Sequence, residues 1–417
     1  MYEVKYTEEQ LKKCGLSFLR NYAREMGGTP GLMKKDELVS YILDIQSGKI
    51  APSRKKSGRK PLDFKGVNYG LFGITNIEYD GEGHAYATLS DSSSETVVKG
   101  GFEMVSEGVG AIVNGNGVSA FVPNAIINEY RLKPGDFVEG EYETGRNNSK
   151  VVTSVSFING KLPSDFIGRR SFEKETAIYP KKKIPLFKSG SVGKVADIFC
   201  PIGKGQRCLV LYKSGMDEIA VIEKLSESFK DAGVRTVALY ANCRPEDGQY
   251  VETVCDEAIW TSFEKPDEEH KNAVFKAVER VKRIAESGNP SALLVGSLAS
   301  MREAFGKDGD VAMKPVFSVA KNTERCESVT LIALTDDEAL AEKFRPYCNA
   351  FIVTDGKTAD IKRSWTRRGE SLLSDREIAV AQSLLQTLER EDISDKIRDL
   401  ADKSGTQEEF ISALERL

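Results

Sequence analysis

The sequence offers little material for several common kinds of functional site. It has only two histidines, His84 and His270, so neither a histidine-rich metal site nor a Ser-His-Asp triad is easily assembled. Its seven cysteines are scattered without a Cys-x-x-Cys pair, which indicates buried apolar side chains in a reducing compartment. No run of about 18 apolar residues and no apolar N-terminal segment is present, so we expect a cytoplasmic protein that does not contact membranes.

What is present predicts a globular protein of several domains. The chain has 417 residues, of which 40% are hydrophobic and 29% are charged. This length predicts two or three domains, each able to bury a core. The formal net charge of -4 argues against a uniform electrostatic attraction to nucleic acid, although local basic patches can still attract phosphate.

The pattern along the chain predicts a multidomain α+β architecture. Residues 1–50 show helical periodicity, and 51–63 form a basic linker that serves either as a solvated hinge or as an arm touching phosphate. Residues 64–160 carry short β-like runs separated by turn residues, which is typical of a small barrel. Residues 161–195 are a connector, and 196–417 alternate between strand and helix patterns, which predicts a parallel α/β domain.

Individual elements follow from the same patterns. Barrel strands are predicted at 70–77, 84–89, 108–113, 119–122 and 136–142. Strands of the α/β domain are predicted at 209–211, 236–240, 292–295, 329–334 and 350–353. Helices are predicted at 34–46, 217–232, 268–287 and 375–389, with a helical cap at 393–417.

Residues 197–220 have the strand–loop–helix layout of a phosphate-binding loop, in which backbone N–H groups and a helix N-terminus hold phosphates. Such a loop needs Gly-Lys-Ser/Thr at the start of the helix. Here Lys213, Ser214 and Gly215 are followed by Met216 and Asp217. An apolar side chain replaces the cation, and a carboxylate would face the phosphates. The loop is therefore predicted to have the layout of a nucleotide site but to lack the side chains that bind phosphate and magnesium.

Five segments together carry a resemblance to one known family, the bacterial transcription termination factor Rho. They are residues 201–207 (PIGKGQR), 244–246 (RPE), 262–266 (SFEKP), 281–286 (VKRIAE) and 364–373 (SWTRRGESLL). The resemblance covers nearly the whole chain. It implies a small N-terminal helical module, a cold-shock or OB-like RNA-binding barrel, and a RecA-like α/β domain with the P-loop NTPase fold.

The resemblance also implies which functional positions have been lost. The family is a ring-shaped hexamer that binds nascent RNA and uses ATP and magnesium. Met216 and Asp217 stand where the family has its phosphate lysine and magnesium-binding hydroxyl. Cys243 replaces the carboxylate that polarises water, Gly296 replaces the magnesium-binding aspartate, and Gly356 stands in the register of the adenine-stacking phenylalanine. We therefore expect neither a bound cofactor nor ATP hydrolysis.

One catalytic position is retained. Arg367 matches the arginine finger of the family, but without a phosphate to touch it can equally be a structural salt-bridge residue at a subunit face.

The RNA-binding elements are altered rather than absent. Strand 108–113 has aliphatic residues where the family has base-stacking aromatics, and 64–100 is an insertion relative to the family. Aromatic stacking contributes about 1–3 kcal/mol per base, so we expect weak or altered binding of single-stranded RNA. The residues that could still contact RNA are Phe121, Arg131, Lys133, Arg146 and Lys150.

The favoured function is therefore an RNA-binding regulator of transcription termination with an inactive ATPase domain. It would act as a homo-hexamer or in a mixed ring with an active Rho, with RNA polymerase as a further potential partner. Two alternatives stay open: an active ATP-dependent translocase in which Lys213 serves the phosphates, and a protein-interaction scaffold without nucleic-acid binding.

Overall fold

The computed structural model describes most of the chain, namely residues 7–13, 16–26, 28, 33–50, 74–79, 85–89, 97–114, 117–144, 149–166, 168–387 and 393–417. The predicted linker 51–63 and candidate Arg146 lie outside these residues. The chain divides into two compact units, 1–97 with 141–144, and 98–140 with 145–417. No helix among the described residues is both long enough and apolar enough to cross a membrane.

The first unit contains three helices, α1 (Glu8–Lys13), α2 (Leu16–Glu25) and α3 (Lys35–Gln46). Leu38, Val39 and Ile42 recur at helical spacing along α3 and pack against Leu19 of α2 in a small apolar core. Strands β1 (Ile74–Tyr79) and β2 (Ala85–Leu89) form an antiparallel hairpin that is a sheet of its own.

A closed barrel of five strands follows, in the order β3 (Val97–Ser106), β4 (Val109–Asn114), β5 (Gly117–Pro123), β7 (Lys150–Ile158) and β6 (Phe137–Thr144). Phe102, Ile112 and Val122 fill its interior. Helix α4 (Asn124–Tyr130) connects β5 to β6. The predicted OB-like barrel is thus present, but two of its predicted strands are wrong: the runs at 70–77 and 84–89 contribute to the separate hairpin β1-β2. The first barrel strand, β3, begins inside the segment 64–100 that the sequence assigns to an insertion.

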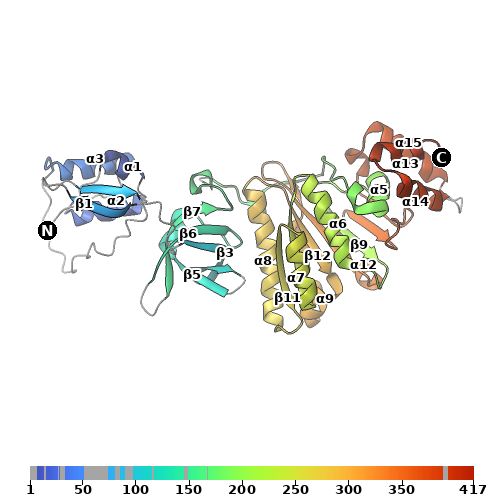
Figure 1. Cartoon of the computed structure of the whole chain (residues 1–417), viewed down its shortest axis with the longest axis horizontal. Helices are drawn as coiled ribbons and strands as arrows, with labels where there is room; N and C mark the ends of the chain where they lie inside the picture. Colours follow the sequence, from blue (N-terminus) through green and yellow to red (C-terminus); the bar gives the residue numbers. More distant parts are fainter. Residues whose placement is uncertain are drawn as a thin grey trace. The chain divides into compact units, whose positions relative to one another are not determined.

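The α/β domain is built on a seven-stranded sheet with the order β11-β10-β12-β14-β9-β15-β16 (Figure 1). The strands are β9 (Arg207–Tyr212), β10 (Arg235–Cys243), β11 (Glu257–Ser262), β12 (Ser291–Ser297), β14 (Val329–Thr335), β15 (Ala350–Thr354) and β16 (Trp365–Thr366). All neighbours are parallel except β15 and β16. The predicted parallel α/β domain is thus confirmed.

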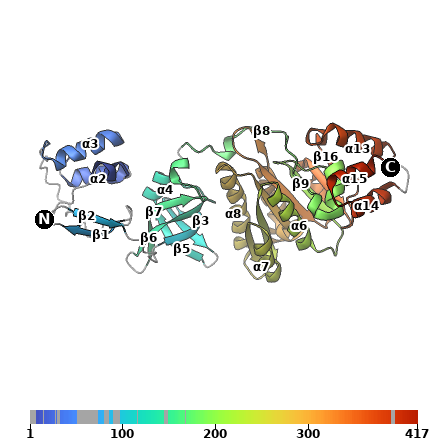
Figure 2. The ribbon, with the colours of Figure 1, turned by 45° about the horizontal axis from the view of Figure 1, so that its top comes forward.

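Helices cover both faces of this sheet (Figure 2). Alternate residues of β10 point to opposite faces of the sheet. Ala238 and Tyr240 pack in the hydrophobic core on one face, and Val237 and Leu239 pack in the core on the other. The first core is completed by α5 (Gly190–Phe199), α6 (Glu218–Asp231), α7 (Pro245–Val254), α13 (Asp375–Thr387), α14 (Ile393–Lys403) and α15 (Gln407–Leu414). The second is completed by α8 (Asp267–Glu286), α9 (Leu298–Ala304), α11 (Lys314–Val319) and α12 (Glu338–Phe344).

Several strands were not predicted, among them β3, β7, β11 and the two-residue strand β16. Strand β11 is a half-exposed strand at the edge of the sheet, so it lacks the apolar run of its buried neighbours. Strand β3 contains Gly100 and Gly101, which interrupt its alternation; a Cβ at Gly100 would lie 2.4 Å from the carbonyl oxygen of Val113. Strand β7, by contrast, alternates in burial and its β-branched residues would have allowed its prediction.

Candidate functional site

The loop between β9 and α6 is a tight turn held by backbone hydrogen bonds. The N–H of Lys213 donates to the carbonyl of Thr354 at 3.1 Å, and the N–H of Met216 donates to the carbonyl of Lys213 at 3.2 Å. Gly215 has φ of 87°, a left-handed conformation that favours glycine. Lys213 and Ser214 are exposed on this loop. The loop thus lies between a buried strand and a helix, as the sequence predicts.

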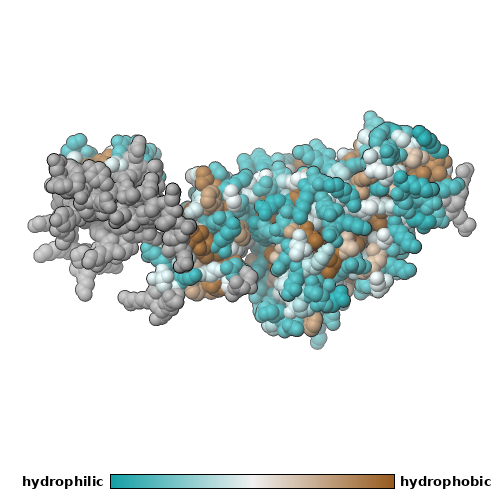
Figure 3. All heavy atoms as spheres, viewed as in Figure 1, coloured by the Kyte–Doolittle hydropathy of each residue, from teal (hydrophilic) through white to brown (hydrophobic). Residues whose placement is uncertain are grey.

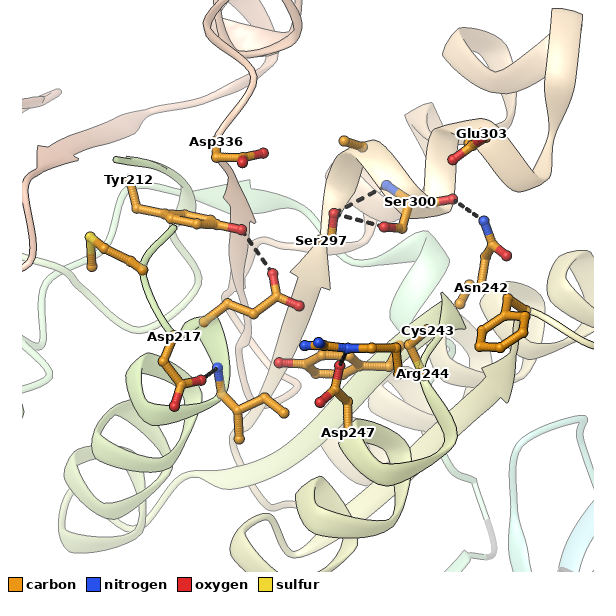
Figure 4. Close-up of a pocket in the computed structure, with 17 residues that line it drawn as sticks. Tyr212, Asp217, Asn242, Cys243, Arg244, Asp247, Ser297, Ser300, Glu303 and Asp336 are labelled. Atoms are coloured by element: carbon orange, nitrogen blue, oxygen red, sulfur yellow. Dashed lines mark hydrogen bonds and ion pairs between the residues drawn. The ribbon is translucent and has the colours of Figure 1, made fainter. Parts of the chain in front are cut away.

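The N-terminus of α6 is occupied by the protein's own carboxylate. The Oδ1 atom of Asp217 accepts hydrogen bonds from the N–H groups of Ile219 at 3.0 Å and Ala220 at 3.4 Å (Figure 4). These are N–H groups that would point at a phosphate, because a helix N-terminus attracts anions. A phosphate bound there would have to displace Asp217 or share the site with a second negative charge.

Met216 occupies space beside the loop that follows β15. Gly356 in that loop has φ of 88°, and a Cβ there would lie 2.9 Å from Cε and 3.0 Å from Sδ of Met216. The thioether thus lies against the position where the resemblance places an adenine-stacking ring. The side chain in contact with Gly356 here is therefore the apolar thioether of Met216.

Gly296, which the resemblance aligns with a magnesium-binding aspartate, lies against a tyrosine ring. A Cβ at Gly296 of β12 would lie only 2.4 Å from Cε1 of Tyr240 on the neighbouring strand β10. The Tyr240 ring is buried, with 2% exposure. Any side chain at position 296 therefore requires the ring to move.

Cys243 ends β10 and is half-buried. Burial, together with the nearby carboxylate of Asp247, raises the pKa of its thiol to about 11. The thiol is therefore protonated at neutral pH and cannot take a proton from water. The adjacent Arg244 donates from Nε to Oδ2 of Asp247 at 2.8 Å, so its charge is already compensated.

A cleft of about 480 Å³ lies at the carboxyl ends of β9, β10, β12 and β14, and Met216, Asp217, Tyr240 and Cys243 are among the residues that line it (Figure 4). Five carboxylates face it, and among the described lining residues Arg244 is the sole cation. The acidic residues are Asp217, Glu218, Asp247, Glu303 and Asp336. A cleft with five negative charges and one positive charge repels the phosphates of a nucleotide.

The charge excess perturbs the groups in the cleft. The Tyr212 hydroxyl donates to Oε2 of Glu218 at 2.9 Å. Even so, the pKa of Glu218 is raised, chiefly by burial and also by the neighbouring charges of Asp247 and Asp336. No group of three or more histidine, cysteine or acidic side chains in the described part of the chain is arranged to hold a metal ion.

Arg367 lies apart from this cleft within its own chain. It is exposed just after β16, and its backbone N–H donates to the carbonyl of Asn349 at 2.9 Å. Its guanidinium has no ion-pair partner among the described residues, so the structural salt-bridge reading finds no support within the chain. Of the predicted site residues, the cleft thus brings together Met216, Asp217 and Cys243. Lys213, Ser214, Gly215, Gly296 and Arg367 are not among the residues that line it.

The described RNA-contact candidates lie on the barrel and differ in their exposure to solvent. Phe121 is 39% exposed on β5, Arg131 is exposed at the end of α4, and Lys150 is exposed at the start of β7. Lys133 instead places its ammonium 3.1 Å from the buried carboxylate of Glu286 on α8. Lys133 is therefore committed to a structural ion pair, which its position near the barrel edge did not reveal.

The barrel also exposes apolar side chains. On the face seen in Figure 3 the described surface is largely hydrophilic, with apolar residues gathered in a few places. Those of the barrel are Val97, Met104, Val105, Val109, Val118, Phe121 and Phe157.

Sequence reasoning missed several residues of the cleft, namely Tyr212, Glu218, Tyr240, Glu303 and Asp336. Asp336 and Glu218 could have been found, because each follows a predicted buried strand at the edge where parallel strands end. Tyr240 could not, because inside the apolar run of β10 it is indistinguishable from a core aromatic.

Comparisons with known proteins bear on the family. No protein-family model matches the sequence. Curated proteins named "Transcription termination factor Rho" are similar, for example from Streptosporangium roseum (28% identity, 64% of this chain and 77% of the relative) and Karelsulcia muelleri (24%, 70% and 89%). The protein of that name from Borreliella burgdorferi is 25% identical over 69% of this chain and 64% of its own length.

Solved structures bear on the fold. The ATP synthase subunit NeqB from Nanoarcheaum equitans aligns with a TM-score of 0.50 at 13% identity, over 58% of this chain and 77% of that one. With the seven-stranded sheet and the five-stranded barrel, this likeness supports the predicted RecA-like α/β fold joined to an OB-like domain. Over about two thirds of its length the chain is thus similar in sequence to proteins named transcription termination factor Rho.

Proposed function

We propose that this chain is a Rho homologue that regulates transcription termination by binding RNA or a protein partner, without hydrolysing ATP. The observation that carries the proposal is the state of the cleft at the β9–α6 loop. Its helix N-terminus is capped by Asp217, and five carboxylates face one compensated arginine. Losing a single charge-stabilising donor costs about 10²–10³ in rate, and here the cation, the metal ligands and the base are replaced together.

We propose that the domains divide at the predicted boundaries and that the chain assembles as a homo-hexamer or in a mixed ring with an active Rho. In a mixed ring, Arg367 would be available to a neighbouring active site, because its guanidinium has no ion-pair partner among the residues described. Single-stranded RNA and RNA polymerase are the proposed partners, and the cytoplasm is the proposed location.

The proposal is tested by RNA-stimulated ATP turnover of the purified chain, with an active Rho as the positive control. We expect no turnover above the background of a protein-free sample. In the same experiment series, adding the chain to an active Rho in a transcription termination assay should change the fraction of terminated transcripts. RNA-dependent turnover by this chain alone would contradict the proposal.

RNA binding is tested by fluorescence anisotropy with a labelled single-stranded RNA at low salt. Replacing Phe121 by alanine should weaken binding by about 1–3 kcal/mol if its exposed ring stacks on a base. Tyr250→Ala is a matched control, because Tyr250 is a similarly exposed aromatic on α7, away from the barrel.

A scaffold without nucleic-acid binding is the second candidate, and one observation favours it. The ammonium of Lys133, one of few basic groups predicted to edge the RNA groove, is paired with Glu286. The absence of any RNA retention at low salt, where electrostatic binding is strongest, would establish the scaffold in place of the RNA-binding regulator.

A further inference from the structure

The cleft that has lost its nucleotide chemistry retains unpaired negative charge. Asp217 caps α6, Glu218 accepts from Tyr212, and Asp247 pairs with Arg244. Glu303 on α9 and Asp336 after β14 are exposed and have no hydrogen-bond or ion-pair partner among the described residues. Two carboxylates thus face the cleft with nothing to neutralise them.

A second, independent feature points into the same cleft. The hydroxyl of Tyr240 is buried, the residue being 2% exposed, and it has no hydrogen-bond partner among the described residues. Tyr240 lines the cleft together with Glu218 and Asp247. A buried hydroxyl without a partner is unfavourable, so a polar group entering the cleft would gain a hydrogen bond that the protein itself does not supply.

The charges around the Tyr240 hydroxyl indicate which kind of ligand would be favoured in the cleft. Burial raises the pKa of Tyr240, and the nearby carboxylates of Glu218 and Asp247 raise it further, together with Cys255 and Cys243. The hydroxyl therefore lies in a negative field. A group that donates N–H bonds and carries positive charge suits this position better than an anion or a neutral acceptor.

The arrangement favours an organic cation over a metal ion. The carboxylates come from four different elements, and no group of them among the described residues is arranged to ligate a metal. The uncharged polar side chains of Asn242, Ser297 and Ser300 also line the cleft. At about 480 Å³ it has the size of a small-molecule site.

We propose that this cleft binds an organic cation carrying ammonium or guanidinium groups, held by Glu303 and Asp336 and hydrogen-bonded by the Tyr240 hydroxyl. Two sources share this chemistry, a free polyamine and a basic side chain of another polypeptide. The proposal does not depend on RNA binding or on a role in termination. It shares with the proposed function only the exclusion of nucleotide from the cleft.

The test is isothermal titration of the full chain at low salt with spermidine and, separately, with N-acetyl-arginine amide. The variant Glu303→Gln/Asp336→Asn removes the two unpaired carboxylates, and we expect binding to weaken about tenfold, two exposed charge pairs together contributing roughly that much. The matched control Glu227→Gln/Glu324→Gln removes the same charge from exposed sites outside the cleft and should leave affinity unchanged. Tyr240→Phe should weaken binding about fivefold through loss of the hydroxyl.

The two probes distinguish a free polyamine from a basic side chain of another polypeptide. Saturable binding of spermidine alone supports a free polyamine, and saturable binding of the arginine amide supports a side chain of another polypeptide. The proposal is overturned if neither probe binds, if the cleft variant and the control bind alike, or if magnesium chloride displaces the probe as a tighter ligand. Nucleotide binding in the cleft would overturn this proposal and the proposed function together, whereas loss of RNA binding would leave this one standing.

Discussion

At the scale of single residues, several replaced positions have a neighbour that fits the replacement. Met216 lies against Gly356, and the ring of Tyr240 lies against Gly296. The substitutions could be identified from the sequence because the loop and strand ends were recognisable. Their partners could not, because Tyr240 and Gly296 lie on different strands that only the folded sheet brings together.

Gly296 gives a direct test of this fit. Replacing it by alanine places a Cβ within 2.4 Å of the Tyr240 ring, so we expect destabilisation of about 1–3 kcal/mol by overpacking. Urea denaturation measures the change. In a double-mutant cycle with Tyr240→Leu, the cost of Gly296→Ala should fall, because the smaller side chain leaves room. Strict additivity of the two changes would show that the ring is not what excludes a side chain.

Asp197 gives a test by pH. Burial raises the pKa of its carboxyl to about 7 from an ordinary value of 3.8, despite hydrogen bonds from the N–H of Leu186 and the nearby charge of Lys183; Glu377 acts in the same direction as burial. Because the folded-state pKa is the higher one, the stability from this group is present below about pH 4 and is lost as pH rises through 7.

The matched variant is Asp197→Asn, which keeps an oxygen for the Leu186 N–H but does not titrate. Relative to this variant, the wild-type chain should lose stability between pH 5 and pH 8 in urea denaturation, by a few kcal/mol at most, since one pKa unit corresponds to about 1.4 kcal/mol. Parallel stability curves for the two proteins would mean that Asp197 has an ordinary pKa in the fold.

At the scale of elements, the N-terminus of α6 is capped by a side chain of the protein itself. Its first turn begins at the loop of a phosphate site, yet its free N–H groups are satisfied by Asp217. The helix itself was predictable from its apolar spacing. Which group satisfies its N-terminus was only partly predictable, because Asp217 is a favourable N-cap residue in its own right.

The cap predicts a stability effect independent of any ligand. Asp217→Ala should destabilise the chain by about 1 kcal/mol, because two backbone N–H groups lose their acceptor. Asp217→Ser keeps a capping oxygen and should cost much less. Thermal denaturation of both variants provides the comparison, and equal melting temperatures for the alanine and serine variants would argue against a capping role.

At the scale of the whole molecule, buried ion pairs join the barrel to the α/β domain. Arg169, whose side chain is 4% exposed, lies 2.6 Å from Asp136 of the barrel and 3.5 Å from Glu286 of α8. The order of domains could be predicted from sequence patterns. This junction could not, because its charged residues are far apart in the sequence and look like ordinary surface residues.

Replacing Arg169 by methionine would leave the buried carboxylate of Asp136 without its cationic partner, whereas Glu286 would keep Lys133 and Arg283. We therefore expect a loss of about 3–5 kcal/mol. Arg170→Met is the control, because the Arg170 side chain is 52% exposed and its pair with Glu175 should contribute about 1 kcal/mol or less. Chemical denaturation of both variants measures the difference. Equal losses in the two variants would mean that the junction does not depend on this arginine.

The central claim, that the cleft of this Rho-like chain does not bind nucleotide, is tested most directly by titrating the full chain with ATP in the presence and absence of magnesium. Isothermal titration should show no saturable heat under either condition, because Asp217 occupies the helix N-terminus and the cleft carries an excess of carboxylates. Saturable, magnesium-dependent binding at micromolar ATP would contradict the account.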